Sequence, residues 1–426
     1  MFERIVLPNG LRLLVCPMPH TYSVSVGFFL GTGSRFEAEP IGGASHFIEH
    51  MLFKGTERFP TANDIAITIE GIGGMFNAST GREVTNYWVK VARPHFKTAL
   101  DVLVDMLRHS RFVQEEIEKE RQVIIEEINM TLDVPEDLVQ LAISALQWPD
   151  NPIGRDVAGT KESVGAMSRS TLLDYMAAHY GPTNTVLAIT GNITVADSLS
   201  VVQAYLGDWQ GGSRQAYVPH ADSQTEPRVK VIYRPTEQAN LCLSLPGLSR
   251  KEPERFVLRL INAILGEGMS SRLFQEIREK QALAYAVESY LEVLDETGAL
   301  GAYAGVEPDK TDRTIQAILA EWDRLRQQPV SQSELDKTRE FVKGRILLRM
   351  EDTYAVTVWN GEQELLQSQV MSVEEVIAVL DAITPADILA LAQRIFDPSK
   401  INLAIVGPFG SLEAPETDRF RRLLAS

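Results

Sequence analysis

Cysteine and long apolar runs are both scarce in this chain of 426 residues. Cys16 and Cys242 are the only cysteines, too few for a disulfide framework or a thiolate metal site, and redox chemistry is therefore not expected. No apolar stretch approaches the roughly 20 residues that span a bilayer, and the first residues lack the regions of a secretory signal. We therefore expect a cytoplasmic protein without a membrane partner.

Basic residues are also in deficit, with 41 Lys and Arg against 57 Asp and Glu and a net charge of −16. This balance disfavours nucleic acid and anionic membranes as partners and mildly favours neutral or basic ligands. The hydrophobic content of 44% and the charged content of 23% are typical of a soluble globular protein. A chain of this length predicts two or three domains.

A polar stretch near the middle of the chain, residues 210–227, carries Gly, Ser and Pro and has no apolar periodicity. We take residues 213–227 as a linker between a first domain, 1–212, and a second domain, 228–426. The segments that begin at Ala44 and Glu115 align, at one common offset, with those that begin at Asn262 and Ser333. Two segments that share an offset indicate a duplicated α+β unit.

The first domain contains His-x-x-Glu-His, at His46, Glu49 and His50, in a segment with a helical apolar pattern and a possible N-cap at Ser45. At 100° per residue the two histidines lie about 40° apart and Glu49 about 60° to the other side of His46. Two imidazoles one turn apart can hold Zn²⁺, with the carboxylate beside it. The alternative is a helix with two stacked histidines whose hydrogen bonds are satisfied without a metal.

A long amphipathic helix from about Glu115 to Met130 offers a third ligand. Its apolar face, which includes Ile117, Val123, Ile124 and Ile128, is centred close to Glu120, and Glu127 lies about 20° away. Buried carboxylates are costly without a cation or strong hydrogen-bond donors. We therefore predict Glu127 as the third ligand and Glu120 as a residue that orients a ligand histidine. A solvated acidic helix explains the other glutamates but neither of these two.

Two histidines and one glutamate leave the fourth tetrahedral position open to water, which is typical of a catalytic zinc site. Zinc lowers the pKa of water, and Glu49 can accept its proton and later deliver it to a leaving amine. The matching reaction is metal-assisted hydrolysis of an amide, and the predicted cofactor is one Zn²⁺ per chain. The aligned positions of the second domain carry Ile264, Gly268 and Arg345, so that domain lacks the ligand set.

Four segments together resemble the M16 group of inverted-zinc metallopeptidases, which includes pitrilysin, insulysin and the mitochondrial processing peptidase. They are HFIEHMLFKGT at 46–56, NASTGREVTNYW at 77–88, EKERQVIIEE at 118–127 and REKQALAY at 278–285. At this length the chain is similar to the two-domain M16B type. The resemblance implies two tandem homologous α+β domains of the LuxS/MPP-like metallohydrolase fold, each with a mixed, mainly antiparallel sheet flanked by helices.

The resemblance also implies roles for four further residues. Residues 73–80 are expected to form a strand, Gly81 a turn and residues 82–92 a return strand. In the family the first strand is an exposed edge that pairs with extended substrate, which makes Asn77 and Ala78 candidates for substrate binding. Arg278 and Tyr285 would bind substrate and stabilise the oxyanion opposite the zinc. From the residues alone, Arg278 is an ordinary helix charge and Tyr285 the start of a strand.

The expected function is therefore a zinc endopeptidase that cleaves short or unfolded peptides inside a clamshell chamber. The expected assembly is a homodimer in which the zinc residues of one subunit face Arg278 and Tyr285 of the other. Two alternatives stay open: a non-catalytic peptide-binding or assembly subunit, and the catalytic subunit of an obligate heterodimer. The retained Glu49 and ligand set argue against the first alternative.

Overall fold

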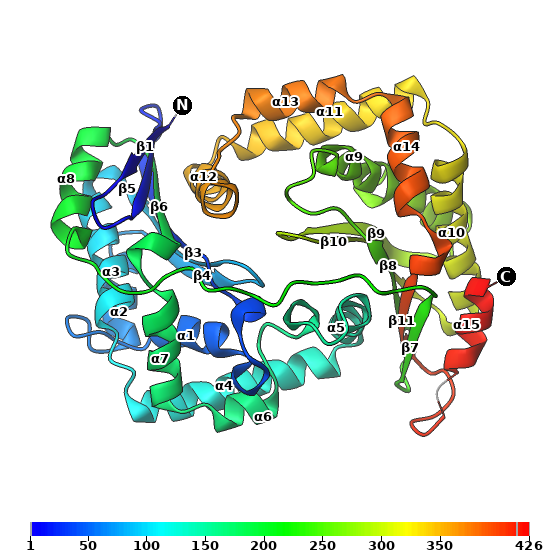
Figure 1. Cartoon of the computed structure of the whole chain (residues 1–426), viewed down its shortest axis with the longest axis horizontal. Helices are drawn as coiled ribbons and strands as arrows, with labels where there is room; N and C mark the ends of the chain where they lie inside the picture. Colours follow the sequence, from blue (N-terminus) through cyan, green and yellow to red (C-terminus); the bar gives the residue numbers. More distant parts are fainter. Residues whose placement is uncertain (1, 415, 426) are drawn as a thin grey trace. The chain divides into compact units, whose positions relative to one another are not determined.

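The computed structural model describes residues 2–414 and 416–425, which divide into two compact units (Figure 1). Unit 1 comprises the residues up to Ile128 together with Asp156–Val218 and Leu347–Ser372. Unit 2 comprises Asn129–Arg155, Pro219–Ile346 and the residues from Val373 onward. Among the described residues, every helix is too short or too polar to cross a lipid bilayer.

Unit 1 is built on a six-stranded mixed sheet with the order β1-β2-β6-β3-β5-β4. Only β2 and β6 pair in parallel, and all other neighbours are antiparallel. The strands are β1 Glu3–Val6, β2 Arg12–Pro17, β3 Ser23–Leu30, β4 Met75–Thr80, β5 Thr85–Ala92 and β6 Thr185–Gly191. The helices are α1 Ala44–Leu52, α2 Ala62–Glu70, α3 Phe96–His109, α4 Gln114–Asp133, α6 Lys161–Ala166, α7 Arg169–His179, α8 Val195–Leu206 and α12 Thr353–Gln367.

Helices cover both faces of this sheet, which is why β3 and β6 are almost continuously buried. On one face α12 packs against β3 and β6, with Phe29 and Val358 in the shared core. On the other face α3 packs on β5 and α8 on β2. Because neighbouring side chains of a strand alternate, Trp88 meets Tyr354 of α12 while Tyr87 points to the opposite face and bonds Tyr180.

Unit 2 is built on a five-stranded sheet with the order β7-β11-β8-β10-β9, in which only β7 and β11 are parallel. The strands are β7 Arg228–Tyr233, β8 Ala239–Pro246, β9 Ala284–Val293, β10 Gly298–Val306 and β11 Asn402–Gly407. The helices are α5 Pro135–Gln147, α9 Arg255–Gly266, α10 Thr311–Gln327, α11 Gln332–Arg349, α13 Val373–Ala382, α14 Pro385–Ile395 and α15 Thr417–Ala425, with the π-helix η6 at Phe274–Lys280.

The two sheets share one topology. Without β1, the first sheet has the order β2-β6-β3-β5-β4, and each strand has a counterpart of the same direction in β7-β11-β8-β10-β9. The expected fold class, two homologous α+β domains with mixed and mainly antiparallel sheets, is thus confirmed. Residues 207–227 form no helix or strand.

The compact units exchange equivalent helices along the chain. Helix α5 comes from the first half of the sequence but packs on β8 and β11 of unit 2, around Val139 and Ile143. Helix α12 comes from the second half and packs on the sheet of unit 1. The division into 1–212, 213–227 and 228–426 therefore remains a prediction about the duplication of the sequence. The compact units follow different boundaries, because each contains segments from both halves of the chain.

The hairpin of β4 and β5 has other strand ends than the sequence predicts. Strand β4 starts at Met75, and the return strand β5 starts at Thr85 instead of residue 82. The turn is longer because the carbonyls of Gly81 and Arg82 accept the N–H groups of Ser34 and Arg35. Glu83 of the same turn pairs with the buried Arg35 side chain.

Candidate metal centre

The helix that carries the two histidines begins one residue after a left-handed glycine. Gly43 is the N-cap residue, with φ of 92°, and a Cβ there would lie 2.5 Å from the carbonyl oxygen of Ala158. The predicted N-cap, Ser45, is wrong. The buried Glu37 caps the helix instead: its two carboxylate oxygens accept the N–H groups of Gly43 and Ser45, each at 2.7 Å.

The Ser45 hydroxyl is instead part of a buried hydrogen-bonded chain. It lies 2.9 Å from the Tyr175 hydroxyl, which lies 2.9 Å from Thr32 Oγ1. Thr32 also contacts His179 Nδ1 at 3.2 Å, and the rings of Tyr175 and His179 are stacked. These contacts fix the first turn of α1 against α7 and the end of β3, and so fix where the histidines point.

His46, His50 and Glu127 come together as predicted. Their ligand atoms all lie within 4.8 Å of one another. The Nε2 atoms of the histidines are 3.2 Å apart, and Glu127 Oε2 lies 3.8 Å from that of His46 and 3.6 Å from that of His50. A tetrahedral ion with bonds of about 2.0–2.1 Å keeps its ligand atoms about 3.3–3.4 Å apart. The three side chains fit Zn²⁺ with only small adjustments.

The protonation of the histidines supports the same conclusion. Glu120 Oε2 lies 3.0 Å from His50 Nδ1, which places the proton on that nitrogen and leaves the Nε2 lone pair toward His46. Burial, reinforced by His50, lowers the pKa of His46 to about 4, so this ring is neutral at pH 7. The two Nε2 atoms face each other at 3.2 Å, and both can offer a lone pair to one cation when His46 carries its proton on Nδ1.

Charges around the histidines also suit a dication. Lys54 binds Glu120 Oε1 at 2.6 Å. Burial opposes ionisation of Glu120, but the hydrogen bonds from His50 and Lys54 outweigh it and lower the pKa of this carboxyl. Three carboxylates, those of Glu49, Glu120 and Glu127, are thus set against one ammonium group. One divalent ion held by neutral imidazoles would balance the two remaining negative charges.

The burial expected for the α4 carboxylates holds for Glu120 only. Its side chain is 6% exposed, whereas that of Glu127 is 39% exposed, and Val123, assigned to the apolar face, is 44% exposed. The reason is that α4 is covered along one stripe, which consists of Ile117, Glu120, Arg121, Ile124 and Ile128 and leaves out Val123 and Glu127. Glu127 is therefore a ligand candidate because of its distance to the histidines and not because of its burial.

Glu49 is oriented by the edge strand of the sheet. It lies on α1 between the two histidines, and its carboxylate accepts a short hydrogen bond from Thr80 of β4. Burial raises the pKa of Glu49, against the opposing effects of the Thr80 hydrogen bond and the charge of His50. A carboxylate with a raised pKa, next to a metal, is suited to accept and release protons.

The strand that carries Thr80 has one unpaired edge. β4 is the last strand of the first sheet and pairs only with β5. Asn77 and Ala78 both lie on it, and the Ala78 N–H is bound by the Asn77 side chain at 2.8 Å, because no neighbouring strand accepts it. Such an edge can pair with an extended peptide.

Arg278 and Tyr285 belong to unit 2 and contact each other. Arg278 Nη1 donates to the Tyr285 carbonyl at 2.9 Å, and its guanidinium carbon lies 4.6 Å from the centroid of the Tyr285 ring. The Tyr285 side chain is exposed at 78%. The pair therefore forms one exposed polar group between η6 and β9.

Sequence reasoning missed three residues at this centre: Glu37, Lys54 and Thr80. Lys54 lies just beyond the end of α1 at Leu52, so helical spacing does not place it beside His50. Glu37 and Thr80 contact α1 from a loop and from a strand, and no periodicity links them to it.

Comparisons with known proteins agree with the site. Residues 14–161 match the family model described as insulinase, peptidase family M16, and residues 166–342 match the model of the M16 peptidase inactive domain. A protein of Streptomyces coelicolor named as an uncharacterized zinc protease is 35% identical over 418 residues, 97% of this chain and 91% of that protein. The uncharacterized zinc protease YmxG of Bacillus subtilis is 34% identical over 413 residues, 97% of this chain and all of that protein. The chain belongs to the M16 peptidase family.

The M16 fold is also present in solved structures with much lower identity. A protease from Helicobacter pylori has a TM-score of 0.90 at 20% identity and covers 95% of this chain and 99% of its own. An M16 inactive-domain protein from Pseudomonas fluorescens has a TM-score of 0.89 at 17% identity, with 96% and 99% covered. The inactive-domain match falls mainly on the second half of the M16 chain, where Ile264, Gly268 and Arg345 replace the ligands.

Proposed function

We propose that this M16 protein is a zinc-dependent endopeptidase. The observation that carries the proposal is the convergence of His46, His50 and Glu127 beside a Glu49 carboxylate that is held in place by Thr80. Zn²⁺ bound there would act as a Lewis acid, lowering the pKa of water and polarising the carbonyl group of the scissile bond. The ligand set is that of a catalytic site, because three protein ligands leave one tetrahedral position open.

The chain's own residues supply the remaining steps. Glu49 takes a proton from the attacking water and delivers it to the nitrogen of the leaving amine. Thr80 keeps one carboxylate oxygen fixed, so the other is left for the proton. Glu120 holds His50 in the tautomer whose Nε2 is a ligand.

The proposed substrate is a short or unfolded peptide in extended conformation. The free edge of β4 around Asn77 and Ala78 can bind a peptide through main-chain hydrogen bonds, which tolerate many sequences. The carboxylate of Glu49 touches the same strand at Thr80, so a peptide paired with β4 lies alongside the general base. Most segments of a folded protein already use their main-chain hydrogen bonds, so an unfolded chain pairs with β4 more easily.

Cleavage of a fluorogenic peptide tests this proposal. We expect activity that a chelator removes and added zinc restores, and a loss of about 10²-fold or more in Glu49→Gln, because proton transfer in such reactions contributes about 10²–10⁴-fold. Glu126→Gln, an exposed glutamate of α4, is the matched control and should keep full activity. Activity that resists the chelator, or an unchanged Glu49→Gln rate, would contradict the enzyme assignment and favour a non-catalytic peptide-binding subunit.

We also propose a homodimer in which Arg278 and Tyr285 of one subunit complete the zinc site of the other. Two-fold symmetry then gives two equivalent shared sites. Mixed dimers of Glu49→Gln and Tyr285→Phe chains should recover part of the activity that each variant loses alone. No recovery in verified mixed dimers would exclude sharing, and activity only with a second, related chain would indicate a heterodimer. Location in the cytoplasm stays a prediction.

A further inference from the structure

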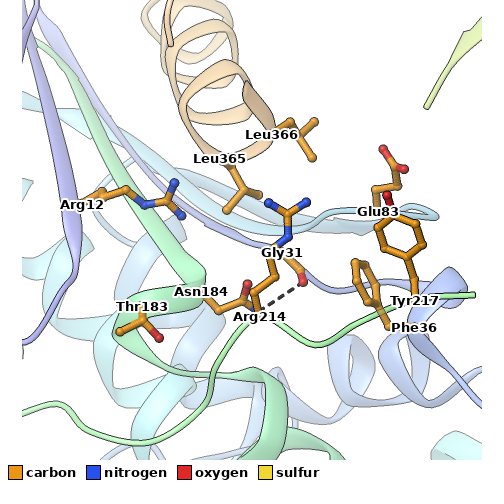
Figure 2. Close-up of a pocket in the computed structure, with 10 residues that line it drawn as sticks. All are labelled: Arg12, Gly31, Phe36, Glu83, Thr183, Asn184, Arg214, Tyr217, Leu365 and Leu366. Atoms are coloured by element: carbon orange, nitrogen blue, oxygen red, sulfur yellow. Dashed lines mark hydrogen bonds between the residues drawn. The ribbon is translucent and has the colours of Figure 1, made fainter. Parts of the chain in front are cut away.

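A cavity with two arginines in its lining lies in unit 1, and none of the residues assigned to the zinc site lines it. Its volume is about 200 Å³. Since water in the liquid takes about 30 Å³ per molecule, the cavity has room for a small molecule. Ten residues line it: Arg12, Gly31, Phe36, Glu83, Thr183, Asn184, Arg214, Tyr217, Leu365 and Leu366 (Figure 2).

Two guanidinium groups give the cavity its charge. Figure 2 shows those of Arg12 and Arg214 below the last turn of α12, near Leu365 and Leu366. The Arg12 side chain is only 16% exposed, whereas Arg214 lies on an exposed segment. Burial lowers the pKa of Arg12, Glu364 opposes this shift, and the nearby charges of Arg4 and Arg214 reinforce it.

The carboxylates near these guanidinium groups are already used. Glu364 accepts two hydrogen bonds from Arg4 Nε at 3.0 Å each, and Arg12 Nη1 donates to the Glu364 carbonyl at 3.1 Å and lies 3.8 Å from Glu364 Oε1. Glu83, the one acidic residue of the lining, pairs with the buried Arg35. The Arg214 side chain makes no hydrogen bond or ion pair with any residue of 2–414 or 416–425.

The guanidinium groups of Arg12 and Arg214 repel each other, and an anion bound to both would relieve that repulsion. Two guanidinium groups are well suited to a carboxylate, which accepts paired N–H donors. The rest of the lining is largely apolar: Leu365 and Leu366 on one side, and the rings of Phe36 and Tyr217, whose centroids are 5.9 Å apart, on another. These rings and leucines can pack against an apolar group.

We propose that this cavity is a binding site for a small organic carboxylate with an apolar body. Arg12 and Arg214 bind the carboxylate, and the leucines and aromatic rings contact the body. The site involves three separate parts of the chain: the start of β2, residues 214–217 and the end of α12. The proposal does not depend on zinc or on peptidase activity.

Isothermal titration calorimetry of the full chain with benzoate tests the proposal. Benzamide, which has the same shape without the charge, and inorganic phosphate, which has charge without an apolar body, are the comparison probes. We expect benzoate to bind at least about ten-fold more tightly than either, and more weakly as salt is added. The titration is repeated after chelation, because a carboxylate can also bind an open zinc ion, and binding to the cavity should survive.

Substitutions then assign the binding to the two arginines. Arg214→Gln should weaken benzoate binding at least about ten-fold while the fold is retained, because this exposed side chain has no partner to lose. Arg12→Gln should weaken it at least as much. Arg93→Gln, an exposed arginine outside the cavity, is the matched control and should bind as the parent chain does. Equal binding of benzoate and benzamide, tighter binding of phosphate, or unchanged binding in Arg214→Gln would overturn the proposal.

Discussion

The two repeats of this chain solve the same electrostatic problem in different ways. In unit 1, α1 and α4 bring Glu49 and Glu127 beside two histidines, where a divalent cation could balance the carboxylates. In unit 2, the aligned residues are Glu267 and Arg345, on or next to α9 and α11. Their side chains lie 3.8 Å apart, so the carboxylate already has a cation.

The surroundings of Glu267 complete this internal balance. Arg259 Nη2 donates to Glu267 at 3.0 Å, and Asn262 Nδ2 donates to it at 2.6 Å. Guanidinium groups thus neutralise Glu267 in unit 2, whereas in unit 1 we assign the balancing charge to a metal. The comparison teaches that the repeat without the histidines balances this carboxylate with cations of its own side chains.

Copying the second repeat into the first is the strongest test of this comparison. Glu127→Arg replaces a ligand by the residue found at the aligned position, so we expect zinc affinity to fall by more than about 10³-fold and peptidase activity to fall to background. The chain should still fold, because the new charge faces Glu49 and Glu120. Equilibrium zinc competition and circular dichroism measure both effects, with Glu126→Arg as the control.

Removal of the carboxylate behind His50 should have a smaller effect. Glu120→Gln is expected to weaken zinc binding about 10–100-fold, because it takes away the partner that orients the ligand imidazole. It also removes the contact that raises the pKa of His50 against burial, so in the zinc-free chain His50 should titrate at lower pH than in the parent. NMR of the imidazole protons follows this shift. An unchanged His50 titration would mean that Glu120 does not hold the ring in solution.

The cap of α1 should matter for stability by a smaller amount. Glu37→Gln keeps one acceptor oxygen and replaces the other by a donor, so one of the N–H groups of Gly43 and Ser45 loses its partner. We expect a loss of about 1–3 kcal/mol in the free energy of unfolding. Urea denaturation of the zinc-free chain measures it. Glu39→Gln, two residues away and exposed, should unfold like the parent chain, and equal stability of both variants would rule out the capping role.

The reverse conversion should leave the zinc content of the chain unchanged. Ile264→His, Gly268→His and Arg345→Glu together place the ligand types in unit 2, yet we expect the zinc content to stay at one ion per chain. Helix α9 ends at Gly266, and Gly268 has φ of 83°, so the two new histidines would not lie one helical turn apart. Elemental analysis counts the zinc, and a second tightly bound ion would show that residue type alone makes the site.

Prediction from sequence succeeded where the geometry of one helix decided the outcome. The spacing of His46 and His50, and the position of Glu120 and Glu127 on one long helix, follow from 3.6 residues per turn. Helix geometry alone could not predict that Glu127 lies close to the histidines, because α1 and α4 are far apart in the sequence. The resemblance to M16 peptidases supplied this information. The edge strand with Asn77 and Ala78 also came from that resemblance, and the structure places both residues on an outer strand.

Other features could not be predicted because they depend on partners far away in the sequence. Ser45 cannot cap α1 because the helix begins one residue before it, and its hydroxyl bonds Tyr175, which nothing in the local pattern shows. The exchange of α5 and α12 between the units is equally hidden, since each helix is amphipathic and fits either of two sheets with the same topology. Periodicity tells which face is buried but not against which sheet.

X-ray absorption at the zinc edge of the purified full chain tests the central claim most directly. The account predicts one zinc per chain with two imidazole nitrogens, the remaining ligands being oxygen, and the loss of this ion in Glu127→Arg but not in Glu126→Arg. A spectrum without two imidazole ligands, or bound zinc that is unchanged in Glu127→Arg, would contradict it.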